Sequence, residues 1–149
     1  LPILTNYSAS VIRHATNVLA YIGWGQHAEV SDAWATDGTL SLHGNSYWFV
    51  AEAIESFNGR WSPGYGQRSY QEWFTSTAFG GTNWGNTPIM AMSSVYEPTV
   101  DGYFLPKVWL PLWNLSRSTA RCAWLSQPPA KPDAHPERMQ LTGDPLVKR

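Results

Sequence analysis

Three side chains with metal-binding or acid–base capacity lie close together near the start of the chain. His27, Glu29 and Asp32 bring an imidazole and two carboxylates into one short segment. These groups are ligands for divalent cations, but the spacing H-x-E-x-x-D matches no strict metal motif. We therefore interpret the segment as solvated loop charge, predict no metal or other cofactor, and retain His27 as a candidate polar-site residue.

Two other sets of residues have the groups that nucleophilic catalysis needs. His43 lies close in sequence to Ser41 and Ser46, which would suit a histidine-assisted serine hydrolase. Cys122 and His135 would suit a cysteine–histidine pair, but Cys122 falls in an apolar helical stretch, where a cysteine is usually a small buried side chain. A histidine beside a turn is most often a hydrogen-bonded loop residue, so an atypical hydrolase is the weakest functional interpretation.

Glu97 and Asp144 share a different context, because each precedes a proline at the end of a stretch with the composition of a strand. Functional groups of parallel α/β proteins gather at the carboxyl ends of strands. Carboxylates before a proline also cap neighbouring backbone N–H groups and fix corners of the chain. We favour the capping role and keep both residues as candidates for a polar site.

The aromatic content is high, with nine Trp, seven Tyr and five Phe in 149 residues. Trp61 and Tyr65 lie in a loop rich in Gly and Pro, and Tyr103, Trp109 and Trp113 gather around two prolines. Loops and proline-broken stretches bury their side chains incompletely. We therefore predict an exposed patch of these five aromatic residues, which serves either as a protein interface or as a platform for stacking sugar rings.

Composition and charge exclude several classes of protein. A chain with 43% hydrophobic residues and 14% charged residues has too much apolar surface for intrinsic disorder. Its formal net charge of −1 argues against nucleic-acid binding, which requires a basic surface. The longest apolar stretches, such as 108–113, are far shorter than a membrane-spanning helix. A single cysteine also excludes a disulfide within the chain.

These candidate residues require a scaffold, and the hydrophobic pattern predicts strands and helices in alternation. We expect strands at 18–24, 39–42 and 88–96, helices at 48–57, 69–79 and 112–125, a Pro-rich connector at 126–138, and a closing strand and turn at 139–147. Within the helix at 48–57, Glu52 and Glu55 lie opposite the apolar face. The alternation predicts an α/β fold, with a mostly parallel sheet flanked by helices, over a single domain or part-domain spanning 1–149.

Four segments of the sequence resemble a known fold. They are "VLAYIGWGQHAEVSDAW", "YWFVAEAIESFNGRW", "GNTPIMAMSSVYEP" and "TGDPLVKR". Together they resemble the C-terminal half of the caspase-like α/β fold of gingipain-type and clostripain-type peptidases, over roughly residues 18–149. The similarity is closer to an uncharacterised group of bacterial secreted or envelope proteins that share this fold.

The resemblance implies a catalytic histidine and cysteine that this sequence does not match. The family places the histidine in a Gly-His-Gly turn, and the matching turn here is Gly23-Trp24-Gly25, so Trp24 stands at the histidine position. An indole cannot shuttle a proton. The cysteine would fall near 36–42, where the chain has none. We therefore predict that the protein is not an enzyme.

The resemblance also shapes the functional expectation. The chain opens at Leu1 without an initiator Met, which suggests a processed product or a part of a longer protein, and half of a caspase-like sheet would leave one strand edge to be covered. We expect a non-catalytic structural or protein-interaction subunit of an exported or envelope assembly, partnered by another subunit or by the rest of its own chain. The resemblance implies a secreted, periplasmic or envelope location. The alternative is an aromatic carbohydrate-binding module with a glycan ligand.

Overall fold

A computed structural model of the chain describes residues 12–15, 17–24, 40–42, 46, 49–54, 56–61, 69–129, 131–132 and 134–149. The strands are β1 (Ile12–Ala15), β2 (Ala20–Trp24), β3 (Leu40–Leu42), β4 (Val50–Ile54), β5 (Met90–Ser94) and β6 (Met139–Gly143). The α-helices are α1 (Pro106–Asn114) and α2 (Thr119–Leu125). Short 3₁₀ helices are η1 (Tyr70–Trp73), η2 (Ala78–Gly80), η3 (Val100–Gly102) and η4 (Pro136–Arg138).

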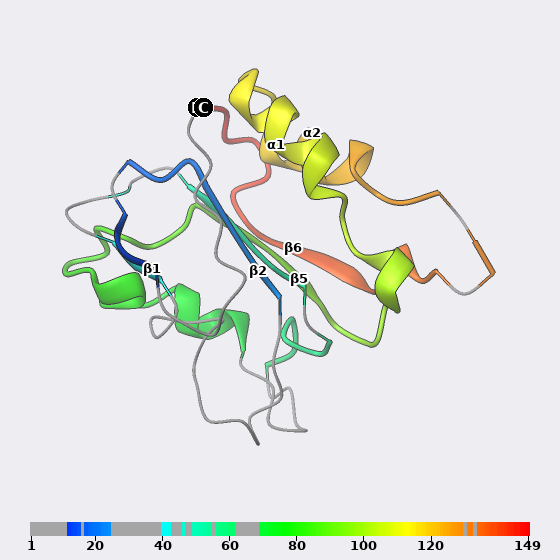
Figure 1. Cartoon of the computed structure of the whole chain (residues 1–149), viewed down its shortest axis with the longest axis horizontal. Helices are drawn as coiled ribbons and strands as arrows, with labels where there is room; N and C mark the ends of the chain where they lie inside the picture. Colours follow the sequence, from blue (N-terminus) through cyan, green and yellow to red (C-terminus); the bar gives the residue numbers. More distant parts are fainter. Residues whose placement is uncertain are drawn as a thin grey trace.

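The main sheet has four strands in the order β2-β4-β5-β6 (Figure 1). Strands β2, β4 and β5 are parallel, and β6 runs antiparallel to β5. Strands β1 and β3 form a separate parallel pair. The α/β class is therefore confirmed, but the sheet is mixed where we expected it to be mostly parallel.

The strands expected at 18–24, 39–42 and 88–96 contain β2, β3 and β5, and β6 is followed by a turn as expected. The helix expected at 48–57 is wrong, because this segment forms β4. Val50 and Ala51 are both fully buried, on opposite faces of the sheet. A strand buried on both faces is a nearly continuous apolar run, and such a run also contains the spacing of a helical face.

The helix expected at 69–79 is also wrong, since only the short η1 and η2 form there. Ser69 caps η1 as its position suggested, with its side chain accepting a hydrogen bond from the Gln71 N–H. Phe79 has a φ of 52°, a left-handed conformation that a regular α-helix cannot contain. The segment therefore turns twice instead of extending as one helix.

The helix expected at 112–125 is divided into α1 and α2. Ser116 has a φ of 57°, which ends the first helical segment, and the Ser118 side chain accepts from the Arg121 N–H to cap the second. Helix α1 begins well before the expected start, with Pro106 in its first turn, where a missing N–H costs nothing. The Pro-rich segment 126–138 joins α2 to β6 and ends in η4.

The sheet has two differently covered faces. Helices α1 and α2 both pack on one side, visible in yellow and orange in Figure 1, and we call this side the helix-covered face. Its buried residues are Val50, Met90, Met92, Phe104, Trp109, Trp113, Cys122 and Ala123. The opposite side, the turn-covered face, packs against η1 and η2 and buries Phe49, Ala51, Trp73, Ala78, Phe79 and Ala91. Within the described part of the chain, α-helices thus cover one face of the sheet, and not both faces as expected.

Two backbone segments pack closely where the chain leaves β4. The Gly59 N–H donates to the Ser94 carbonyl at 2.7 Å, which ties this turn to the end of β5. A Cβ atom at Gly59 would lie 2.9 Å from the carbonyl carbon and oxygen of Ser94. Glycine is required here because no side chain fits between the two backbones, and this close approach positions the following residue, Arg60.

Candidate functional site

A cluster of polar and aromatic side chains lies at the carboxyl ends of the parallel strands β4 and β5. Open α/β sheets bind their ligands at this end of their parallel strands. The cluster combines residues of the turn after β4, the segment after β5 and the segment that enters β6. We call it the carboxyl-end cluster, and its members are Ser56, Phe57, Arg60, Tyr96, Glu97, His135, Glu137 and Arg138.

Arg60 is held on several sides. Its Nε donates a hydrogen bond to the Val95 carbonyl at 2.6 Å, and its guanidinium carbon lies 4.6 Å from the ring centroid of Phe57 and 4.7 Å from that of Tyr96. These are cation–π distances. Phe57 has a φ of 62°, an uncommon conformation for a bulky residue, which directs its ring in this arrangement. The Arg60 guanidinium is consequently fixed before any ligand arrives.

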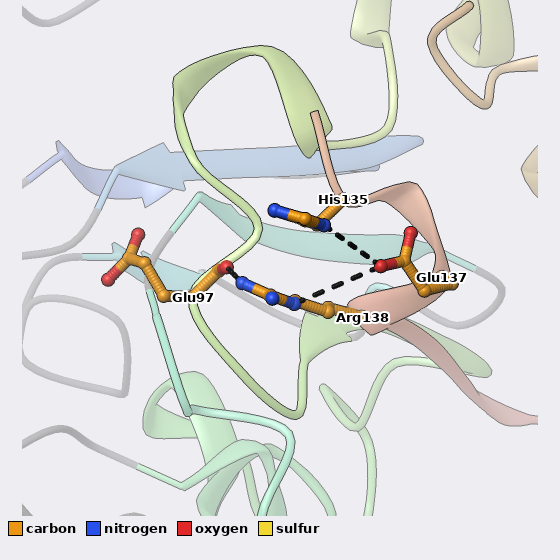
Figure 2. Close-up of polar contacts among 4 residues, drawn as sticks. All are labelled: Glu97, His135, Glu137 and Arg138. Atoms are coloured by element: carbon orange, nitrogen blue, oxygen red, sulfur yellow. Dashed lines mark hydrogen bonds and ion pairs between the residues drawn. The ribbon is translucent and has the colours of Figure 1, made fainter. Parts of the chain in front are cut away.

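A second arginine contacts the same tyrosine. Arg138 lies with its guanidinium carbon 5.1 Å from the Tyr96 ring centroid, and one of its terminal nitrogens donates to the Glu97 carbonyl (Figure 2). Its own carbonyl accepts from the Val95 N–H at 2.8 Å. The two carbonyls that flank Tyr96, those of Val95 and Glu97, therefore each accept a hydrogen bond from an arginine side chain.

The carboxylates of the cluster have other partners. Figure 2 shows the Glu97 carboxylate turned away from Arg138, and it accepts a hydrogen bond from the Ser56 hydroxyl. Glu137 lies 3.0 Å from His135 Nδ1 and 3.9 Å from Arg138 Nε (Figure 2). A hydrogen bond from its own backbone N–H, with smaller contributions from His135 and Arg138, holds the pKa of the Glu137 carboxyl below its ordinary value.

Exposed rings adjoin these charges. Tyr96 is 52% exposed, and Trp61, which follows Arg60 directly, is 83% exposed. The arrangement thus offers two fixed guanidinium groups next to accessible aromatic surface, a combination suited to binding. Among the described residues, no group of three or more His, Cys, Asp or Glu side chains is arranged to hold a metal ion.

The aromatic patch expected from the sequence is only partly present. Trp61 is exposed as expected, Tyr103 is half-buried, and Tyr65 lies outside the described residues. Trp109 and Trp113 are both 0% exposed, so their assignment to the patch is wrong. They are four residues apart on α1 and therefore share the side that packs on the sheet. The proline between them, Pro111, lies on the exposed side of α1.

Both buried indoles have hydrogen-bond acceptors. Trp113 Nε1 donates to the Leu19 carbonyl at 3.1 Å, and Trp109 Nε1 donates to a carboxyl oxygen of Glu52 at 2.6 Å. The polar end of each indole is thus satisfied within the protein, which permits complete burial of these large side chains.

Glu52 was expected on a solvated helix face, and the structure instead buries it completely in β4. Burial in the helix-covered face raises the pKa of its carboxyl from 4.5 to about 8, although the hydrogen bond from Trp109 opposes that shift. Its second oxygen, Oε1, has no hydrogen-bond partner among the described residues. The apolar residues on both sides of Glu52 in the sequence were the available signal for an interior position.

The candidate polar residues are not brought together. Asp144 follows β6, and its N–H donates to the Ile89 carbonyl next to the start of β5, whereas Glu97 follows the end of β5. The Asp144 carboxylate accepts from the Leu146 N–H at 2.9 Å, which is the capping role we favoured. His27 lies outside the described residues. Trp24 ends β2 in register with Ile54.

The residues considered for nucleophilic catalysis are also accounted for. Cys122 is buried in α2, its pKa is raised by burial, and its Sγ donates to the Arg117 carbonyl at 3.7 Å, so it is the small buried side chain expected. Ser46 is buried, with its Oγ accepting from the Val18 N–H at 3.3 Å. Ser41 lies in β3, and His43 lies outside the described residues.

Neither arginine of the carboxyl-end cluster was among the candidate residues predicted from the sequence. Arg60 follows the Asn58-Gly59 turn, and Arg138 precedes β6, so only the pairing of β5 with β6 brings the second arginine to Tyr96. An arginine next to aromatic residues in a turn was the one available signal, and it applies to Arg60 alone.

Within the described residues, no helix has both the length and the apolar character needed to cross a membrane. Comparisons with models of protein families, with curated proteins and with solved structures find no match to this chain. The similarity to the caspase-like fold therefore stays a prediction from the sequence.

Proposed function

We propose that this protein is a non-catalytic interaction subunit that binds another protein through the carboxyl-end cluster and the adjacent Trp61. The observation that carries the proposal is the pair of guanidiniums held near Tyr96, a ring that is 52% exposed, together with the 83% exposed Trp61, which follows Arg60 in the chain. Trp, Tyr and Arg are the residues most enriched among the energetic centres of protein interfaces. Fixing them before binding lowers the entropic cost of association.

The internal pairing of the polar groups favours binding over catalysis. The Ser56 hydroxyl donates to the Glu97 carboxylate, and His135 pairs through Nδ1 with Glu137. A serine mechanism instead needs a hydroxyl that donates to a base such as histidine. The two halves of such a pair are present in the cluster, but each is engaged with a different carboxylate.

The resemblance to bacterial secreted or envelope proteins supports a partner within an exported or envelope assembly. That partner is another subunit or the remainder of a longer chain. Either would cover the exposed aromatic surface and exclude water from the guanidinium groups, which would strengthen their polar contacts.

The test is affinity capture from the source cells with the tagged intact chain, its Trp61→Ala/Tyr96→Ala variant, and Trp124→Ala as the matched control. Trp124 is 72% exposed on α2 and is not a member of the cluster, so its truncation removes an exposed indole and leaves the cluster residues in place. We expect one stoichiometric protein with the wild-type chain and the control, and its loss with the double variant. Equal capture by all three proteins would contradict the proposed surface.

A carbohydrate-binding module is the second candidate, favoured by the exposure of the Trp61 indole and by a side-chain amide bonded to the backbone of the same residue. Gln71 Nε2 donates to the Trp61 carbonyl at 3.3 Å, which holds a side-chain amide next to this aromatic residue. Aromatic faces stack on sugar rings while amides bond their hydroxyls. Titration with soluble polysaccharides, followed by Trp fluorescence, should give no saturable shift for a protein interface. A saturable shift that Trp61→Ala abolishes would favour the carbohydrate module.

A further inference from the structure

We propose that Arg60 and Arg138 form a carboxylate-recognition site for an acidic segment of a protein partner. This inference rests on the proposed function, since it names the chemistry that the partner presents to the carboxyl-end cluster. It is carried by the contacts that hold the two guanidiniums near Tyr96 and by the charges around them.

Arg60 has N–H donors that are available to a ligand. A guanidinium has five N–H groups, and the hydrogen bond from Nε to the Val95 carbonyl uses the one nearest the side-chain stem. The rings of Phe57 and Tyr96 hold the plane of the group. Its two terminal nitrogens remain as a fork that matches the two oxygens of a carboxylate. Among the described residues, no carboxylate forms an ion pair with Arg60.

The guanidinium groups of Arg60 and Arg138 lie close to the same aromatic ring, that of Tyr96. Both guanidinium carbons lie within about 5 Å of one ring centroid, at 4.7 Å for Arg60 and 5.1 Å for Arg138. Their separation is therefore at most the sum of these two distances, roughly one Debye length at 0.1 M salt, where like charges still repel. An anion bound beside Tyr96 would relieve that repulsion, and the half-exposed ring leaves the position accessible.

The charges in the cluster favour a carboxylate ligand over a phosphate. The carboxylates of Glu97 and Glu137 belong to the same cluster, which therefore contains two positive and two negative side chains. A phosphate group carries nearly two negative charges at neutral pH and would be repelled more strongly by these carboxylates. A planar group with a single charge suits the fork and the local balance of charge.

The exposed aromatic surface of the cluster favours an acidic peptide segment as the source of that carboxylate. Exposed apolar surface lies next to the arginines, on Trp61 and on the free part of the Tyr96 ring. A glutamate followed by an apolar side chain would engage a guanidinium and an aromatic ring together. A partner segment in which glutamate and leucine alternate presents both groups within a few residues.

The experiment measures binding of a fluorescein-labelled eight-residue peptide of alternating leucine and glutamate to the intact chain, by fluorescence anisotropy. A matched peptide replaces every glutamate with glutamine. The protein variants are Arg60→Lys and Arg138→Lys, which keep the charge but remove the fork, and Arg121→Lys, an exposed control on α2. Inorganic phosphate and an oligogalacturonate serve as competitors.

We expect saturable binding of the glutamate peptide, with affinity at least about tenfold lower for the glutamine peptide and for each of the Arg60 and Arg138 variants. The control should bind as the wild type, and phosphate should compete weakly. Thermal unfolding of each variant verifies that it is folded, and the two arginine positions give independent measurements.

Four outcomes would overturn the inference. The first three are equal binding of both peptides, unchanged affinity in both lysine variants, and no detectable binding at about 1 mM peptide. Competition by oligogalacturonate but not by unlabelled glutamate peptide would overturn it in favour of an acidic carbohydrate. The proposed interface would survive each of these results if Trp61→Ala/Tyr96→Ala still abolished capture of the partner, so the two failures are distinguishable.

Discussion

An aromatic ring meets an ionisable side chain in two regions of this molecule, with opposite results. In the helix-covered face, the Trp109 indole donates at 2.6 Å to Glu52, and burial keeps that carboxyl protonated at neutral pH, with a pKa of about 8. In the carboxyl-end cluster, the rings of Phe57 and Tyr96 stack on Arg60, which stays charged.

The difference lies in what replaces water around each group. Glu52 has a single hydrogen bond to the indole, and its other oxygen has no partner among the described residues, so the neutral form is favoured. Arg60 donates a hydrogen bond to the Val95 carbonyl, lies over the rings of Phe57 and Tyr96, and remains partly accessible to solvent. The interior contact therefore makes stability depend on pH. In the carboxyl-end cluster, the contact of aromatic rings with Arg60 instead holds a charged group in a fixed position.

The largest expected effect on stability comes from truncating a buried side chain in the helix-covered face. Trp109→Ala removes a fully buried indole and the hydrogen bond to Glu52, and we expect a loss of about 4 kcal/mol in the free energy of unfolding. Urea denaturation followed by far-UV circular dichroism measures it. Trp124→Ala, which truncates an exposed indole, should change stability by less than about 0.5 kcal/mol. Similar losses in the two variants would contradict the assignment of Trp109 to the core.

Glu52→Gln tests the protonation of the interior carboxyl. Because the pKa of Glu52 rises from 4.5 to about 8 on folding, its contribution to stability is complete below pH 4.5 and is lost as the pH rises towards 8. From pH 5 to pH 7 this loss is roughly 2 to 3 kcal/mol. Glutamine cannot ionise, yet its carbonyl oxygen can still accept from Trp109.

We therefore expect the variant to lack most of this pH dependence and to exceed the wild type in stability at pH 7 and above. Urea unfolding at pH 5, 6, 7 and 8 measures both slopes, and Glu137→Gln, at an exposed position, serves as the control. Parallel slopes for Glu52→Gln and the wild type would show that the interior carboxyl ionises normally.

Gly59→Ala connects the two regions, because its turn links β4 to the carboxyl-end cluster. The added Cβ would lie 2.9 Å from the Ser94 backbone, which cannot move without disturbing the end of β5. We expect a loss of about 2 kcal/mol in stability, within the usual range for overpacking, together with weaker binding of the glutamate peptide because Arg60 is displaced. An alanine variant with wild-type stability and binding would refute the close approach.

The smallest effect on stability is expected in the carboxyl-end cluster. Arg138→Lys removes a guanidinium whose carbon lies 5.1 Å from the Tyr96 ring centroid, on a side chain that is 30% exposed, and we expect a cost below about 1 kcal/mol in unfolding free energy. The same change should reduce peptide affinity about tenfold, so that binding and stability separate in this variant. A stability loss as large as that of Trp109→Ala would assign Arg138 to the structural core.

The sequence predicted some elements well for identifiable reasons. Strands β2 and β5 are short apolar runs bounded by turn residues, and their pattern permits one interpretation. Strand β4 is buried on both faces, and its apolar spacing also fits a helix. Proline near Trp109 and Trp113 suggested a broken, exposed segment, although α1 accommodates Pro111 on its outer side.

The candidate site was less predictable because its contacts are distant in sequence. Glu97 was identified for its carboxylate, yet it is the Glu97 carbonyl that holds Arg138, across a separation of 41 residues. Glu52 was placed on a polar helix face, and its interior position became evident only once β4 was recognised as a strand. Local pattern identifies strand ends, but the pairing of β5 with β6 determines which side chains meet there.

The antiparallel course of β6 has a consequence for how such a protein could diversify. Met139, the first residue of β6, pairs with Ser94, the last residue of β5, so the chain entering β6 delivers His135, Glu137 and Arg138 directly to the carboxyl-end cluster. If the cluster binds a partner as we propose, substitutions in the Pro-rich segment before β6 would change the side chains that reach this partner, while the pairing of β5 with β6 would keep its register.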